Sequence, residues 1–145
     1  MVERIAQKSA VYLLLERGDE ILMLERCNTG YMDGYYSFVA GHVEAGESAT
    51  NAMIREATEE AGITLLPQAL SFAHVCHRAS DAIYYDFFFK ATEWSGQVRN
   101  MEPQKCSDLS WFSKDAVPEN TIPYIRAIIE LVYLHNQPFS EYNWA

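Results

Sequence analysis

Residues 41–63, GHVEAGESATNAMIREATEEAGI, constrain the chain more than any other segment. Residues 48–61 contain neither glycine nor proline and are rich in Ala, Met, Ile and Glu, which favours a helix. Glu47 or Ser48 is placed to cap the start of the helix, and Gly62 is placed to end it. The segment therefore predicts a loop, a helix and a second loop.

Three glutamates gather on one face of this predicted helix. Glu56 lies three residues before Glu59 and four before Glu60, and both spacings place side chains on the same face. Like charges in this arrangement repel one another, and a divalent cation such as Mg²⁺, which takes carboxylate ligands, removes the repulsion. The alternative is an acidic face turned to solvent, and the hexapeptide REATEE alone leaves both interpretations open.

The wider spacing favours the metal site. From Gly41 to Ile63 the chain reads G-x5-E-x7-R-E-A-x-E-E-x-G-I, and this pattern resembles the Nudix box at every fixed position. Ala57 is smaller than the usual aliphatic residue, and Val39 stands where many Nudix proteins carry proline. Every charged position is intact, so the chain is similar to Nudix hydrolases.

The resemblance implies a fold and a reaction. The expected fold class is α/β, an α/β/α sandwich in which helices cover a mixed β-sheet and the loop–helix–loop lies beside the sheet edge. Residues 1–145 are expected to form a single domain, which suits this chain length. The implied reaction is hydrolysis of a nucleoside diphosphate linked to another group, which requires charge on the phosphates to be neutralised.

The resemblance also implies metal ligands in and beside the box. Glu56, Glu59 and Glu60 are expected to bind Mg²⁺, with Mn²⁺ as a substitute, and the carbonyl of Ala40 is the fourth expected protein ligand. Glu59 could instead act through a water molecule. On these residues the protein is expected to be a metal-dependent enzyme.

Further residues are expected to support catalysis. Arg55, beside three acids, is expected to orient them, and Glu47 can accept a bidentate hydrogen bond from it. Many Nudix hydrolases recruit one more acid from outside the box, and the loop candidates are Glu93, Glu102 and Asp108. Glu102 is favoured because the sequence around it, NMEPQKC at residues 100–106, resembles a segment of nucleotide-cleaving relatives. The alternative is that Glu102 is a loop residue without a part in catalysis.

Candidate substrate-binding residues lie outside the box. Arg26 ends a predicted strand, where the resemblance places it near a substrate phosphate and where it would stabilise negative charge. A surface cation is the alternative, and Lys105 has a weaker case of the same kind. Trp111 and Phe38 are candidates to stack on a nucleobase, although aromatic residues on strands more often belong to the core.

The remaining elements follow from apolar periodicity and turn residues. Strands are expected at residues 9–16, 20–26, 35–40, 69–78, 83–91 and 109–113, and a second helix at 122–135. Residues 137–145 form an aromatic tail to which no element is assigned.

Composition limits the partners and the compartment. The formal net charge of −9 argues against binding to nucleic acid or anionic membranes, and it would repel a phosphate substrate unless a cation intervened. The N-terminus lacks a signal-peptide pattern, and no apolar stretch is long enough to span a bilayer. Cys27, Cys76 and Cys106 show neither zinc nor disulfide spacing, which indicates a reducing, cytoplasmic compartment.

Missing subfamily signatures narrow the substrate. Patterns typical of ADP-ribose, dinucleoside-polyphosphate and coenzyme A hydrolases are absent around the box. We therefore expect a small-molecule nucleotide, a standard or oxidised nucleoside triphosphate cleaved to a nucleoside monophosphate and pyrophosphate. The alternatives are an ADP-ribose or nucleotide-sugar hydrolase, an RNA 5′-end pyrophosphohydrolase, and a Nudix module that binds a nucleotide without cleaving it. A homodimer is compatible with aromatic residues 139–144, which could equally cover the core.

Overall fold

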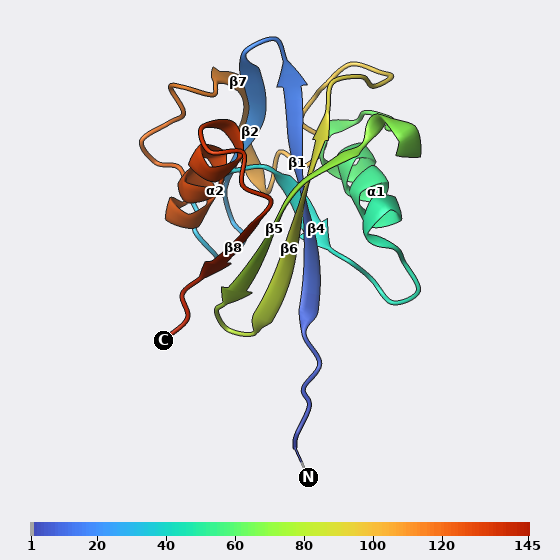
Figure 1. The fold of residues 1–145 in the computed structure, drawn as a ribbon. Coiled ribbons are helices and arrows are strands. Elements are labelled where there is room, and N and C mark those ends of the chain that lie inside the picture. The colour runs from blue at the N-terminus through green and yellow to red at the C-terminus, as the bar shows by residue number, and fades with distance from the viewer. Residues whose placement is uncertain (1) are drawn as a thin grey trace.

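The computed structural model describes residues 2–145, which form one eight-stranded sheet and two α-helices (Figure 1). The strands are β1 (Lys8–Arg17), β2 (Glu20–Arg26), β3 (Tyr36–Ser37), β4 (Val39–His42), β5 (Ser71–Ala79), β6 (Ile83–Ala91), β7 (Cys106–Ser113) and β8 (Phe139–Tyr142). The helices are α1 (Ala49–Ala61) and α2 (Pro123–Tyr133), and a short 3₁₀ helix, η1, spans Pro67–Ala69.

Strand β1 is the centre of the sheet. It pairs in parallel with β6, and it pairs antiparallel with β4 along its first half and with β2 at its end. The main path of the sheet is β3-β2-β1-β6-β5-β8, and β7 pairs with β2 outside that path. Because β1/β6 and β5/β8 are parallel and the other pairs are antiparallel, the sheet is mixed.

The two helices cover opposite faces of the sheet, as Figure 1 shows. Successive side chains of a strand point to opposite faces, so Leu13 joins one buried cluster and Leu14 joins the other. Helix α1 packs on the Leu13 cluster, and α2 packs on the Leu14 cluster. The helix residues buried there are Ala52, Met53, Ala57 and Ala61 from α1, and Tyr124, Ile125, Ile128, Ile129 and Val132 from α2. The predicted α/β/α arrangement is confirmed. Within the described residues, neither helix has the length and hydrophobicity needed to cross a bilayer.

Both ends of the box helix form as the sequence predicts. Ser48 is the N-cap, and its Oγ accepts a hydrogen bond of 3.1 Å from the N–H of Asn51. Gly62 ends the helix in the left-handed region with φ 68°, which an L side chain rarely adopts. The box therefore forms the loop–helix–loop that its spacing predicts.

Other predicted boundaries need correction. The predicted strand at 35–40 is divided at Phe38 into β3, which pairs with β2, and β4, which pairs with β1. Strand β7 begins at Cys106, three residues before the predicted start, because Cys106 and Asp108 already pair with β2. The tail, to which no element was assigned, contains β8 because its residues pair with β5.

Candidate active site

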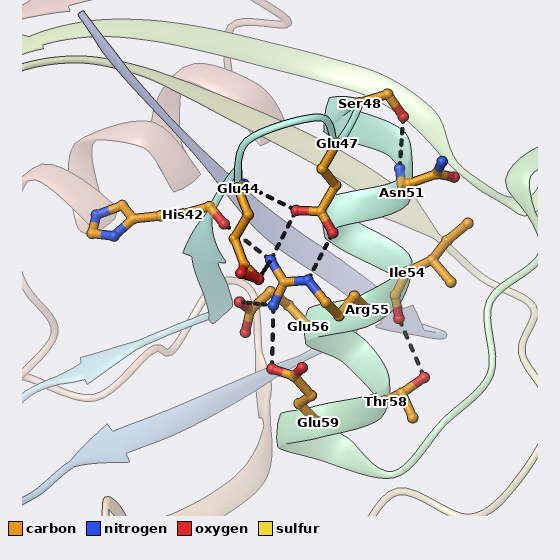
Figure 2. Close-up of polar contacts among 10 residues, drawn as sticks. All are labelled: His42, Glu44, Glu47, Ser48, Asn51, Ile54, Arg55, Glu56, Thr58 and Glu59. Atoms are coloured by element: carbon orange, nitrogen blue, oxygen red, sulfur yellow. Dashed lines mark hydrogen bonds and ion pairs between the residues drawn. The ribbon is translucent and has the colours of Figure 1, made fainter.

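Arg55 ties the loop before α1 to the helix (Figure 2). Its Nε donates to Oε2 of Glu47 over 2.7 Å, and its Nη2 donates to Oε1 of Glu47 over 3.0 Å. Nη2 also donates to the carbonyl of His42 at the end of β4, over 3.1 Å. The hydrogen bonds from Arg55 lower the pKa of Glu47 to about 2. The bidentate pair predicted between Arg55 and Glu47 is present, and the hydrogen bond to His42 ties α1 to β4.

The remaining nitrogen of Arg55 turns to the acids of α1. Its Nη1 donates to Oε1 of Glu56 over 2.8 Å and to Oε2 of Glu59 over 3.2 Å (Figure 2). One guanidinium thus holds both carboxylates on the same side of the helix. Arg55 is the positive centre of an otherwise acidic cluster, and its orienting role in catalysis stays a prediction.

Glu60 is the most buried acid of the box face. Its Oε1 accepts a hydrogen bond of 2.8 Å from the N–H of Ala40 on β4. The pKa of Glu60 is raised to about 8, first by burial and then by the carboxylates of Glu56 and Glu102, against the opposing effect of the Ala40 hydrogen bond. Burial also raises the pKa of Glu56. These acids are held close together at an electrostatic cost.

Glu102 belongs to the same cluster. The N–H of Met101 donates to the carbonyl of Glu60 over 3.2 Å, and the N–H of Glu102 donates to Oδ1 of Asn100 over 3.0 Å. The loop before β7 is therefore tied to the end of α1, and the charge of Glu102 reaches Glu56 and Glu60. The sequence prediction favoured Glu102 over its neighbour Asp108, whose Oδ2 instead accepts a hydrogen bond of 2.5 Å from the hydroxyl of Tyr36.

The acids of the box lie in a cleft of about 890 Å³. Glu56, Glu59, Glu60 and Glu102 line it together with Ala40, Arg26 and Lys105. Arg26 is held by its own loop, since its Nε donates to the carbonyl of Tyr31 over 2.7 Å and its Nη2 donates to Oγ1 of Thr29 over 3.1 Å. Its charge still acts on the acids, because it lowers the pKa of Glu60. The cleft combines clustered carboxylates with cations, as a bound polyphosphate would require.

Two residues predicted to stack on a base lie outside this cleft. Phe38 is 1% exposed and packs in the cluster beneath α2, where its ring meets that of Phe88 edge to face. Trp111 stacks on Trp94 with ring centroids 5.9 Å apart and lines a separate hollow with Arg17. The structure assigns both side chains to packing, in place of the predicted contact with a base.

The cleft also contains residues that sequence reasoning did not select. They are the aromatic or charged side chains of Tyr12, His42, Arg78, Tyr84 and Tyr124. Tyr12 and Tyr124 belong to the buried cluster on which α2 packs. A signal for part of this group was available. Arg78 and Asp86 are opposite charges inside two predicted apolar strands, and such a pair indicates a buried ion pair between neighbouring strands.

A model of the NUDIX domain matches residues 6–132. The chain belongs to the NUDIX family. The NAD-capped RNA hydrolase NudC of Pseudomonas aeruginosa is 32% identical over 115 residues, which make up 75% of this chain and 37% of that protein. The NAD-capped RNA hydrolase NudC of Stutzerimonas stutzeri is 30% identical over the same shares. This Nudix chain therefore spans less than half the length of the curated relatives it matches.

Solved structures agree on the fold. The MutT NUDIX hydrolase from Burkholderia pseudomallei matches with a TM-score of 0.80 and 24% identity, over 88% of this chain and 99% of that one. The MutT protein from Methanosarcina mazei Go1 matches with a TM-score of 0.77 and 22% identity, over 90% of this chain and 95% of that one. The chain has the mixed sheet and two helices of the Nudix fold.

Nudix hydrolases generally use divalent metals, and the donors of this site suit a hard cation. Within residues 2–145, no three His, Cys, Asp or Glu side chains converge as a ready metal cage. The reason is visible in the contacts: Arg55 engages Glu56 and Glu59, and the N–H of Ala40 engages Glu60. Burial raises the pKa of Glu60, and the negative charges of Glu56 and Glu102 raise it too, which a bound cation would oppose. The carboxylate oxygens of these residues are therefore of the kind that a divalent cation binds.

Proposed function

We propose that this Nudix hydrolase is a Mg²⁺-dependent pyrophosphohydrolase that cleaves a standard or oxidised nucleoside triphosphate. Water adds to one phosphorus of the α–β phosphoanhydride, the bond from that phosphorus to the bridging oxygen breaks, and the products are a nucleoside monophosphate and pyrophosphate. One observation carries the proposal: a single cleft contains the carboxylates of Glu56, Glu59, Glu60 and Glu102 together with the cations of Arg26 and Lys105.

Each residue has a distinct part in this proposal. Glu56, Glu59, Glu60 and the carbonyl of Ala40 would hold Mg²⁺, and Mn²⁺ could replace it. The ion, when bound, neutralises phosphate charge and acidifies a coordinated water. Arg55, fixed by Glu47, keeps two of the acids on one side of the helix. Arg26 and Lys105 would bind non-bridging phosphate oxygens, and Glu102 would accept a proton from the attacking water.

The charge of the protein supports dependence on metal. A chain with a net charge of −9 repels a polyphosphate, and the acids of the cleft add to that repulsion. A divalent cation reverses the sign of the local field at the place where the substrate would bind. Within the described residues the three cysteines are free, which supports a cytoplasmic location.

A second candidate is cleavage of the diphosphate linkage in a NAD-type cap on RNA. The observation that favours it is the 30–32% identity to NAD-capped RNA hydrolases. The bond broken belongs to the same chemical class, so the acids of the box would serve either substrate. The net charge of −9 argues against a basic path for RNA and makes this the second choice.

A substrate panel tests both candidates. Purified protein is incubated with Mg²⁺ and nucleoside triphosphates, oxidised nucleotides, NAD, ADP-ribose, dinucleoside polyphosphates, NAD-capped RNA and 5′-triphosphorylated RNA, and products are separated by chromatography. Release of pyrophosphate from a nucleoside triphosphate, abolished by EDTA, is the expected result. Faster turnover of NAD or NAD-capped RNA would replace the first candidate with the second, and no turnover of any substrate would refute both.

A further inference from the structure

The cleft extends to the face of the sheet that α2 covers, and this end of it is a built polar site that the proposed chemistry does not use. It is lined by Arg78 of β5, Tyr84 of β6 and the hydroxyl-bearing rings of Tyr12 and Tyr124. Tyr12 and Tyr124 hydrogen-bond to each other through their hydroxyls over 2.5 Å. A cleft that combines acids and phosphate-binding cations with a second set of polar groups, here Arg78 and tyrosine hydroxyls, has the layout that a nucleotide requires.

Arg78 is fixed at this end. It is 8% exposed, its Nε donates to Oδ2 of Asp86 over 2.6 Å, and its Nη2 donates to Oδ1 of Asp86 over 3.2 Å. The rings of Tyr84 and Tyr124 lie against its guanidinium, with centroids 4.5 and 4.8 Å from Cζ. Asp86 is fully buried. Because each of these contacts restrains the same planar group, Arg78 presents its remaining N–H groups in one orientation.

Arg78 keeps hydrogen-bonding capacity that the protein does not use. Among residues 2–145, no acceptor bonds to its Nη1, although Nε and Nη2 are both engaged by Asp86. No buried side-chain nitrogen or oxygen in this part of the chain lacks a partner, so Nη1 must be accessible to solvent. Since Arg78 lines the cleft, that access comes from the cleft. A ligand there meets donors of fixed direction.

The surroundings of Arg78 suit a base better than a phosphate. Asp86 cancels its charge, and Asp81 places a further carboxylate at the same end, where its Oδ2 accepts a hydrogen bond of 3.5 Å from the hydroxyl of Tyr84. A phosphate would meet no net positive charge there. A flat, neutral, polar group needs no such charge and would accept hydrogen bonds from Arg78.

The donors of Arg78 discriminate between bases. Arginine has no acceptor, and it binds best to two neighbouring acceptors such as O6 and N7 of guanine. Cytosine also offers two neighbouring acceptors, O2 and N3. In adenine each accessible ring acceptor lies beside the N6 amino donor, and in uracil and thymine the N3–H donor separates the two carbonyls.

We infer that Arg78, held by Asp86, selects nucleotides whose base is guanine or cytosine over those with adenine, uracil or thymine. This inference deepens the proposed function and rests on it for the orientation of the substrate in the cleft. It also separates the two candidate functions, because the adenine of a NAD-type substrate is a base that Arg78 disfavours.

Binding of nucleoside monophosphates tests the inference without any chemistry. Calorimetric titration with Mg²⁺ present should give Kd values for GMP and CMP about tenfold lower than for AMP and UMP, the scale of one good bidentate contact. The analogue 7-deaza-GMP, which lacks the N7 acceptor, should bind to the unaltered protein about as weakly as AMP. Equal affinities for all bases, full binding of 7-deaza-GMP, or no measurable binding of any monophosphate would overturn the inference.

Variants identify the responsible residue. Arg78→Lys keeps the charge beside Asp86 but loses the planar donor pair. The affinity for GMP and CMP should therefore fall to that for AMP, and the affinity for AMP should not change. Arg17→Lys makes the same exchange at a guanidinium that stacks on Trp111 outside the cleft, and it should change nothing. Base selectivity that survives Arg78→Lys would also overturn the inference. If Arg78→Lys does not fold, the 7-deaza-GMP result decides the question.

The two proposals fail in different ways. Base-selective binding without turnover of any nucleoside triphosphate refutes the proposed reaction and leaves Arg78 in its role. Turnover of all nucleoside triphosphates at equal kcat/KM, unaffected by Arg78→Lys, refutes the role of Arg78 and leaves the reaction.

Discussion

The carboxylate of Glu56 occupies the place where a side chain on residue 41 would begin. A β-carbon built on Gly41 would lie 2.1 Å from both Cδ and Oε1 of Glu56, far inside van der Waals contact. The first glycine of the box is therefore fixed by the position of an acid fifteen residues later. The spacing between Gly41 and Glu56 in the box therefore has a steric cause: only glycine leaves room for the carboxylate.

Gly41→Ala should damage catalysis and spare the fold. The new methyl group would push the flexible end of Glu56 away from Arg55, and a displacement of about 1 Å in a catalytic site can lower the rate by about a hundredfold. The φ of Gly41 is not in the left-handed region, so the free energy of unfolding should change by no more than about 1 kcal/mol. Steady-state kinetics and urea unfolding measure the two effects.

Gly46→Ala is the matched control for that variant. Gly46 has φ 80° and open space around its α-carbon, so alanine there meets no neighbour but adopts a strained backbone. We expect a loss of about 1–2 kcal/mol in unfolding free energy with kcat retained. An unchanged kcat in Gly41→Ala would show that Glu56 is not needed where it lies.

Glu60→Gln should remove metal-dependent turnover. The amide keeps an oxygen to accept from the N–H of Ala40, so the fold should persist, but it offers no charge to a cation. We expect kcat to fall by about 10³, within the range for loss of a group on which the reaction depends. Addition of Mg²⁺ should raise the melting temperature of the unaltered protein and leave that of Glu60→Gln unchanged. Full activity in the variant would contradict the metal-site proposal.

The loop–helix–loop could be predicted because its chemistry is local. Ser48 and Gly62 satisfy backbone groups within a few residues, and the bidentate geometry of Arg55 and Glu47 follows from one loop and one helix. Strands at 20–26 and 83–91 have the predicted ends because turn residues bound each of them. In these segments the residues that contact one another in the structure are also close in the sequence.

The substrate end of the cleft could not be predicted, because it depends on sheet register. Tyr12, Arg78 and Tyr124 are far apart in the chain, and they meet only because β6 lies between β1 and β5 while α2 packs on the same face. Trp111 and Phe38 were selected by residue type and position near loops. The orientation of each strand places their rings in the core or in another hollow, which no local pattern reveals.

In the metal-free protein, the free energy of unfolding should fall as the pH rises from 4.5 to about 8. In that range Glu60 is protonated in the folded state and ionised in the unfolded state. The pKa of Glu60 is about 8 in the fold against an ordinary 4.5, so between these values the folded state binds one more proton than the unfolded state. The free energy of unfolding from this group therefore decreases with rising pH, by at most about 1.4 kcal/mol per unit.

Urea unfolding in EDTA at pH 5.5, 6.5 and 7.5 measures that slope. Glu60→Gln does not titrate, so its profile should lack this decrease, and the difference between the two profiles isolates the residue. Mg²⁺ should restore stability to the unaltered protein most strongly at the highest pH, because it binds the deprotonated acid. Parallel profiles for the two proteins would show that Glu60 titrates normally.

Trp111→Ala should weaken the fold and leave substrate binding alone. Its ring is partly buried, stacks on Trp94 and supports the guanidinium of Arg17, so truncation should cost about 2 kcal/mol of unfolding free energy, below the about 3–5 kcal/mol of a buried tryptophan. Tyr31→Ala is the opposite case, because Tyr31 is 45% exposed, lines the cleft and lies against Arg26. It should raise KM with little change in stability. If Trp111→Ala raised KM and left the unfolding free energy unchanged, Trp111 would bind substrate and this prediction would be wrong.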